Sequence, residues 1–137
     1  MLTMRPMSGA RRLRVSLVDD DESCRESLSA LLDVLGYEVK VYASVEALLA
    51  ARAGLDADCL LLDASTPGAT GSDLLGTLRA RPKELPFIFV TGYAGQELDR
   101  RLMAFGAIGC LHKPLDEDEL ISALKRATEV AQANAGR

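Results

Sequence analysis

The chain has 137 residues, of which 48% are hydrophobic, and this fits one globular domain with a normal core. It contains 16 Lys and Arg and 20 Asp and Glu, which gives a net charge of −4. This charge argues against direct nucleic-acid binding, which usually needs a basic face. No apolar run approaches the roughly 18 residues of a membrane helix. The three cysteines form no zinc or disulfide pattern, so we expect a cytoplasmic protein.

The first half of the chain alternates strand and helix patterns. Residues 1–12 predict a flexible N-terminal tail, and residues 13–18 are apolar and β-branched and predict a strand that stops at three acids. Leucines at helical spacing then predict a helix, with Ser23 and Glu26 as a capping box. Residues 38–42 alternate charged and apolar side chains and predict a half-exposed edge strand.

The middle of the chain repeats this alternation. Ser44 can cap a second helix that ends near Gly54. Residues 59–62 are continuously apolar and predict a buried strand, which stops at Asp63. A loop rich in Pro and Gly follows, and a third helix ends before Pro82.

The last part of the chain completes the pattern. Residues 87–90 and 108–111 predict the fourth and fifth strands, and residues 96–105 predict the helix between them. A final helix begins near Asp116, and we expect the domain to span 13–131 and residues 132–137 to form a C-terminal tail. Five strands alternating with five helices predict a doubly wound parallel sheet of order 2-1-3-4-5, a flavodoxin-like three-layer (βα)5 sandwich.

Polar residues follow the predicted strands where each strand ends. They are Asp19, Asp20, Asp63, Thr91 and Lys113. Taken singly, each Asp would more often cap a helix, but the set falls on one rim of a parallel sheet. Three close carboxylates need a cation or a proton, and Mg²⁺ suits the site because it takes oxygen ligands and accepts a substrate phosphate. Asp63, alone at its strand end, is the best nucleophile for a phosphoryl group, and Lys113 and Thr91 could meet the new charge.

A family resemblance rests on four motifs, LVDDDES at 17–23, LLLDASTPGATG at 60–71, VTGYA at 90–94 and HKPL at 112–115. They resemble the receiver domains of bacterial two-component response regulators, which have the CheY-like fold. The segment RESLSALLDVLGY is similar to receivers of FixJ-type transcriptional regulators.

The resemblance implies a role for each matching position. Asp63 would accept a phosphoryl group from a sensor histidine kinase or a phosphotransfer protein, with Mg²⁺, or Mn²⁺ in its place, as cofactor. Asp20 would bind the metal directly and Asp19 through a water molecule. The backbone carbonyl of Ser65 would be a further metal ligand.

The resemblance also implies a switch rather than an enzyme. Thr91 would move toward the phosphoryl group, Lys113 would pair with phosphorylated Asp63, and Pro114 would follow through a cis peptide bond. The face made by the fourth helix, fifth strand and fifth helix would then control a downstream protein or output domain, and a homodimer is compatible with this. Cys110 replaces the usual aromatic residue, so we expect the switch to rely mainly on the Thr91 loop and on the fourth helix, around residues 93–105, where Tyr93 is the nearest aromatic residue and could take part.

Two alternatives remain open. Asp19 and Asp21 could imitate the nucleophile and acid of a haloacid dehalogenase-type phosphatase, but Asp63 would then be unexplained. The chain could also be the N-terminal receiver of a longer FixJ-type DNA-binding regulator rather than a stand-alone receiver, and its start (MLTMRPMSGARR) fits either arrangement.

Overall fold

The fold was analysed in a computed structural model that describes residues 12–51, 53–93 and 95–135. Within these ranges, strands and helices alternate along the chain. The strands are β1 (Arg14–Val18), β2 (Glu38–Tyr42), β3 (Cys59–Asp63), β4 (Phe87–Thr91) and β5 (Gly109–His112). The helices are α1 (Glu22–Val34), α2 (Val45–Ala51), α3 (Ser72–Arg79), α4 (Gln96–Met103) and α5 (Glu117–Ala135).

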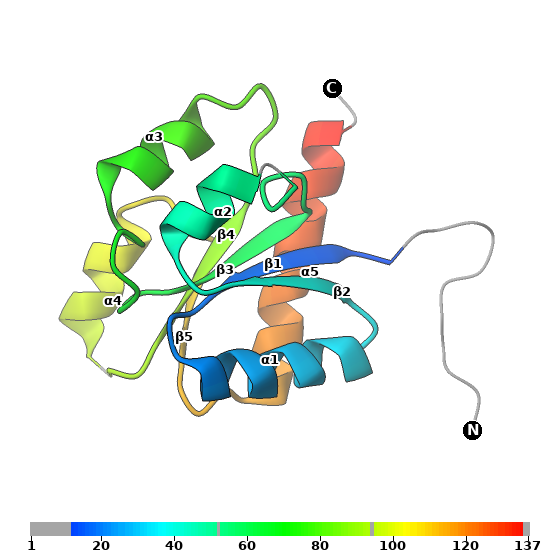
Figure 1. The fold of residues 1–137 in the computed structure, drawn as a ribbon, viewed down its shortest axis with the longest axis vertical. Coiled ribbons are helices and arrows are strands. Elements are labelled where there is room, and N and C mark those ends of the chain that lie inside the picture. Colours follow the sequence, from blue (N-terminus) through cyan, green and yellow to red (C-terminus); the bar gives the residue numbers. More distant parts are fainter. Residues whose placement is uncertain (1–11, 52, 94, 136–137) are drawn as a thin grey trace.

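All neighbouring strands are parallel, and their order is β2-β1-β3-β4-β5 (Figure 1). This confirms the predicted doubly wound sheet. The order reverses between β1 and β3, and in doubly wound sheets ligands bind at the carboxyl ends of such strands, in a region that we call the crevice. The predicted edge strand is also confirmed, because β2 lies at one edge and Val41 is 45% exposed.

Two apolar cores lie on opposite faces of the sheet. Leu60 and Leu62 of β3 pack with buried residues of α2, α3 and α4. Leu61, between them, packs on the other face with α1 and α5. This alternation explains the continuously apolar run of β3, because both faces of a central parallel strand are covered.

The predicted helix ends agree with the structure at some positions and differ at others. Ser44 caps α2, since its hydroxyl accepts from the Ala47 N–H at 3.0 Å. The prediction of Ser23 as the cap of α1 is wrong: Asp21 is the cap, and its carboxylate accepts from the Cys24 N–H at 3.0 Å. Three consecutive acids precede this helix, and the last of them starts it.

The two ends of the domain need separate comment. Helix α5 continues to Ala135, so the prediction of a C-terminal tail is wrong for residues 132–135, which are helical. Of the predicted N-terminal tail, residues 1–11 lie outside the described residues. Arg12 is described, and its guanidinium donates to the carbonyls of Gly36 and Tyr37 at 3.1 and 2.6 Å.

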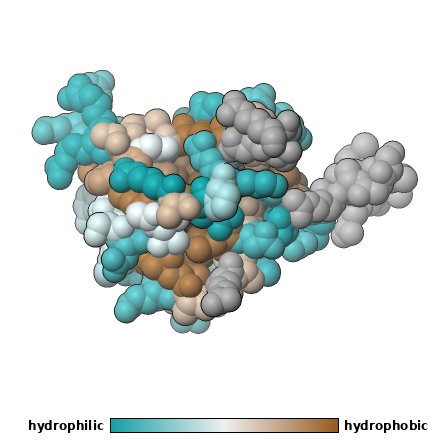
Figure 2. Space-filling model, turned by 90° about the horizontal axis from the view of Figure 1, so that it is seen from above, coloured by the Kyte–Doolittle hydropathy of each residue, from teal (hydrophilic) through white to brown (hydrophobic). Residues whose placement is uncertain are grey.

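Hydrophilic and apolar residues both reach the side of the molecule that is seen from above. Figure 2 shows one side of the molecule, where hydrophilic residues cover much of the surface and apolar residues emerge in smaller areas between them. Among the described helices, none combines the length and the apolar character that a membrane span requires.

Candidate functional site

The predicted site residues meet at the carboxyl ends of the strands. Asp19 and Asp20 directly follow β1, Asp63 and Thr91 are the last residues of β3 and β4, and Lys113 directly follows β5. The structure thus places four separate segments around one crevice. Asp19, Asp63 and Thr91 are almost completely buried, whereas Asp20 is exposed to solvent.

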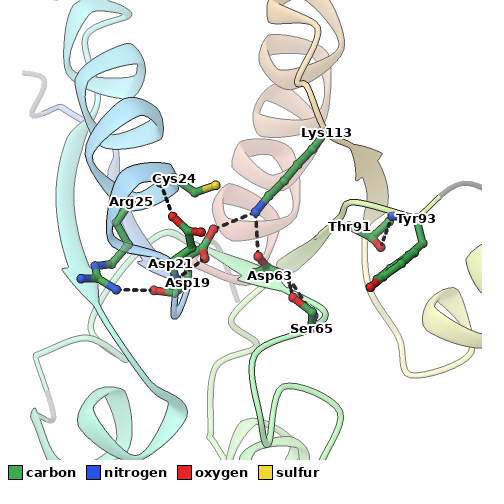
Figure 3. Close-up of polar contacts among 9 residues, drawn as sticks. All are labelled: Asp19, Asp21, Cys24, Arg25, Asp63, Ser65, Thr91, Tyr93 and Lys113. Atoms are coloured by element: carbon green, nitrogen blue, oxygen red, sulfur yellow. Dashed lines mark hydrogen bonds and ion pairs between the residues drawn. The ribbon is translucent and has the colours of Figure 1, made fainter.

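Lys113 connects two of the buried acids. Its Nζ lies 2.7 Å from Oδ2 of Asp63 and 3.0 Å from Oδ2 of Asp19 (Figure 3). The ammonium group therefore offsets part of the negative charge that the strand ends bring together. Charge-assisted bonds of this length are among the stronger hydrogen bonds in proteins.

These contacts decide the protonation states in the crevice. Burial alone would lower the pKa of Lys113, but its bonds to Asp63 and Asp19 outweigh burial and raise that pKa above its ordinary value. Burial would likewise raise the pKa of Asp63, yet the bonds from Lys113 and Ser65 lower it. Lys113 is therefore charged and Asp63 ionised at neutral pH, which is the state a nucleophilic carboxylate requires.

Asp19 differs from Asp63 although both contact the same lysine. Burial dominates and raises the pKa of Asp19, against the bonds donated by the Asp21 N–H and by Lys113. The neighbouring charge of Asp63 acts in the same direction as burial. A second cation in the crevice would stabilise the ionised form of Asp19 and so lower its pKa.

The three acids are a suitable donor set for a hard cation. Asp19, Asp20 and Asp63 each offer a carboxylate oxygen, and these oxygens lie within 4.8 Å of one another. Mg²⁺ takes oxygen ligands and usually keeps several waters, so an open site with one exposed acid fits it. Mn²⁺ prefers the same donors.

Ser65 contacts the nucleophile candidate through groups that sequence analysis did not single out. Its backbone N–H and its hydroxyl both donate to Oδ1 of Asp63, at 2.8 and 2.7 Å. The role of the Ser65 side chain was not predicted, because the family resemblance implies a role only for the Ser65 carbonyl. The available signal was the Asp-x-Ser spacing, since Asp side chains commonly accept from the backbone two residues later.

The same local geometry recurs at the neighbouring strand ends. Asp19 accepts from the Asp21 N–H at 2.9 Å, and the Thr91 hydroxyl accepts from the Tyr93 N–H at 3.1 Å. In Figure 3 the Thr91 side chain lies beside Tyr93, apart from the Lys113–Asp63 pair. A polar side chain that starts a turn in this way therefore lies at the end of β1, of β3 and of β4.

The remaining predicted residues lie near the crevice but outside it. The Lys113–Pro114 peptide bond is cis, as the resemblance implied. Tyr93 is 69% exposed. Cys110 lies on β5, is half-buried, and packs on the sheet face that α2, α3 and α4 cover.

An apolar groove of about 520 Å³ borders the crevice. Leu28 and Leu31 of α1 line one side, and Pro114 and Leu115, which follow β5, line the other. Lys113 also lines this groove, so a partner bound in it would lie next to the charged residues.

Comparison with known proteins gives concordant results. The family model described as the response regulator receiver domain matches residues 15–125. The transcriptional regulatory protein FixJ of Azorhizobium caulinodans is 38% identical over 125 residues, which cover 91% of this chain and 59% of the relative. FixJ of Bradyrhizobium diazoefficiens is 32% identical over 118 residues, 86% of this chain and 58% of the relative. The chain thus spans little more than half the length of these relatives.

Solved structures agree with this assignment of the fold. Full-length FixJ from B. japonicum has a TM-score of 0.78 at 31% identity, with 93% of this chain and 63% of that chain covered. The chemotaxis response regulator CheY4 of Vibrio cholerae has a TM-score of 0.72 at 30% identity, with 85% and 98% covered.

Proposed function

Because the chain belongs to the response regulator receiver domain family, we propose that Asp63 accepts a phosphoryl group in a Mg²⁺-dependent reaction and that this switches the domain. The observation that carries the proposal is the ionised Asp63 carboxylate, held between Lys113 and Ser65 beside two further acids. No catalytic turnover is required of such a domain, because it acts as an acceptor.

The transfer step would use the carboxylate of Asp63 as the nucleophile. One carboxylate oxygen forms a bond to phosphorus while the bond from phosphorus to the donor breaks, and the electron pair of that bond stays on the donor's leaving atom. The lowered pKa of Asp63 keeps this carboxylate ionised and ready to react. Ser65 orients the carboxylate through its two bonds to Oδ1.

Metal binding would fall to the acids of the crevice. We propose that Asp20 and Asp63 are direct ligands together with the Ser65 carbonyl, and that Asp19 acts through a water molecule. When bound, Mg²⁺ supplies neutralising charge to the phosphoryl oxygens. The donor set of three carboxylates, whose oxygens lie within 4.8 Å of one another, supports this assignment.

Lys113 and Thr91 would act on the product. The ammonium of Lys113 already contacts Oδ2 of Asp63, so it is placed to pair with the phosphoryl group that Asp63 acquires. Thr91 would exchange its bond to the Tyr93 N–H for a bond from its hydroxyl to the phosphoryl group. This exchange would change the start of the segment that leads into α4.

Partners follow from the same proposal. The donor would be a sensor histidine kinase or a phosphotransfer protein in the cytoplasm, and the groove between α1 and the residues after β5 offers it an apolar contact beside Lys113. All three cysteines are free, which agrees with a reducing compartment. The FixJ relatives are transcriptional regulators longer than this chain, so a DNA-binding output domain or a separate protein would receive the signal.

The test is labelling by acetyl phosphate, followed by intact mass. The wild type should gain one phosphoryl group with Mg²⁺ present, and Asp63→Asn should gain none. Asp56→Asn is the matched control, because Asp56 is an exposed acid. It pairs with Arg14, the first residue of β1, whereas the candidate site lies at the other end of that strand. Labelling of Asp63→Asn, or labelling without divalent metal, would refute the assignment. Steady release of phosphate beyond one equivalent would instead indicate a phosphatase.

A further inference from the structure

A second group of metal-binding side chains lies outside the crevice, between α4 and β5. It consists of Asp99, Cys110 and His112, whose ligand atoms all lie within 4.8 Å of one another. Nε2 of His112 is 3.0 Å from Oδ1 of Asp99, and Sγ of Cys110 is 3.5 Å from the same oxygen. No role is predicted for His112 from the sequence, and Cys110 is predicted only to replace an aromatic residue.

The fold explains why these three residues meet. Cys110 and His112 are two positions apart on β5, so their side chains leave the same face of the strand. Leu111, between them, packs on the opposite face with α1 and α5. Asp99 belongs to α4, which covers the face that Cys110 and His112 share.

We propose that Asp99, Cys110 and His112 form a Zn²⁺ site that links α4 to β5. Zinc bonds are about 2.0 Å to oxygen, 2.0–2.1 Å to nitrogen and 2.3 Å to sulfur. In a tetrahedral site with these bonds, the oxygen ligand lies about 3.3 Å from the nitrogen ligand and about 3.5 Å from the sulfur ligand. The observed separations of 3.0 and 3.5 Å from the Asp99 oxygen are close to these values, and the sulfur and nitrogen atoms lie within 4.8 Å of each other.

The donor types select the metal. Thiolate and imidazole bind Zn²⁺ well and Mg²⁺ poorly, whereas the three carboxylates of the crevice are donors that suit Mg²⁺. Zinc sites with three protein ligands leave a fourth position for water or for another ligand. The side chains of His112 and Asp99 are 39% and 31% exposed, so an ion can enter and the fourth position can face solvent.

Without the ion, the thiol of Cys110 holds a proton. Burial, together with the neighbouring charge of Asp99, raises the pKa of this thiol to about 11. The protonated thiol donates to Asp99, and zinc would replace that proton and release it to solvent. The carboxylate would then bind the metal in place of the thiol proton.

The site lies next to the switch residue but does not depend on phosphorylation. His112 is the register partner of Thr91 on β4, and Cys110 is the partner of Phe89. An ion held by α4 and β5 together would fix α4 against the sheet beside Thr91. Zinc binding itself requires only the fold, so its test can succeed or fail independently of the proposed phosphorylation of Asp63.

The experiment is calorimetric titration of the whole chain with Zn²⁺ in a large excess of Mg²⁺, which occupies the carboxylates of the crevice. We expect one equivalent of Zn²⁺ to bind. Loss of an outer partner alone weakens metal sites by about 10–100-fold, so Cys110→Ser and His112→Gln should each weaken binding at least about tenfold. Cys24→Ser is the matched control, because Cys24 is a half-buried cysteine on α1 and should bind as the wild type does.

Titration with Co²⁺ gives an independent readout of the ligands. A thiolate bound to Co²⁺ produces a near-ultraviolet charge-transfer band, which should appear in the wild type and in Cys24→Ser and be absent from Cys110→Ser. Circular dichroism identifies any variant that fails to fold, and Asp99→Asn then serves as the substitute. Absence of stoichiometric Zn²⁺ binding, or equal affinity in wild type, Cys110→Ser and His112→Gln, would overturn the proposal.

Discussion

Lys113 is the residue on which the charge balance of the crevice depends. Its ammonium group contacts both Asp19 and Asp63, and those two acids are almost completely buried. Removal of one partner from such a group leaves buried charge uncompensated, which is costly. Lys113 therefore does in the metal-free protein part of what a bound cation would do.

This view predicts different effects of two substitutions on Mg²⁺ affinity. Lys113→Ala removes a positive charge that competes for Asp19 and Asp63, so the variant should bind Mg²⁺ at least as tightly as the wild type. Asp20→Ala removes a proposed direct ligand and should weaken Mg²⁺ binding at least about tenfold. Calorimetric titration with Mg²⁺ measures both affinities.

Asp56→Ala is the control for loss of an acid, since Asp56 is exposed and lies away from the crevice. Its affinity for Mg²⁺ should equal that of the wild type. The assignment of roles would be wrong if Lys113→Ala abolished Mg²⁺ binding while Asp20→Ala retained it.

Among the helices, α4 is held to the sheet by few apolar contacts. It buries Leu102 and half-buries Leu98, whereas α3, of the same length, buries Leu74, Leu75 and Leu78. Gly95, just before α4, has φ of +151°, a conformation that other residues rarely adopt. An element with little buried apolar surface, preceded by such a turn, is suited to shift between two positions.

We therefore predict where the response to phosphorylation is largest. On addition of beryllofluoride, a mimic of the phosphoryl group, amide hydrogen exchange should change most between Thr91 and Phe105. It should change less over residues 108–111, because these amides lie on a strand that stays paired with β4. Cys110 is small and lacks the apolar area of an aromatic ring. It therefore contributes little to the free-energy difference between the unphosphorylated and the phosphorylated conformation of the domain.

Asp63→Asn, treated with beryllofluoride in the same way, should show no change in exchange and is the control. A change centred on Cys110, with the segment from Thr91 to Phe105 unaffected, would contradict the prediction.

The elements were predictable from sequence to different degrees. Strand β3 was predictable because its apolar run stops abruptly at Asp63. The place of the candidate site was predictable because polar residues lie at the ends of such strands. The cap of α1 was ambiguous, since several neighbouring polar residues could each begin the helix. The contact of Asp99 with Cys110 and His112 was not predictable, because it depends on how α4 is placed on β5 by residues distant in sequence.

At the scale of the whole molecule, β3 joins the two cores. Leu62 packs with α2, α3 and α4, and Leu61 packs with α1 and α5, and both side chains are fully buried. Neither core can lose its packing without disturbing the strand that carries Asp63. The two layers should therefore unfold together as one cooperative unit.

This coupling predicts similar losses from truncations on opposite faces of the sheet. Leu61→Ala and Leu62→Ala should each lower the free energy of unfolding by about 2–5 kcal/mol, because each leaves a cavity in a closed core. Urea denaturation followed by circular dichroism should give a single transition for both variants. Val34→Ala, at a position that is 81% exposed, is the control and should change stability by no more than about 0.5 kcal/mol. Two separate transitions, or a large loss in only one of the two leucine variants, would mean that the layers on either side of β3 unfold independently.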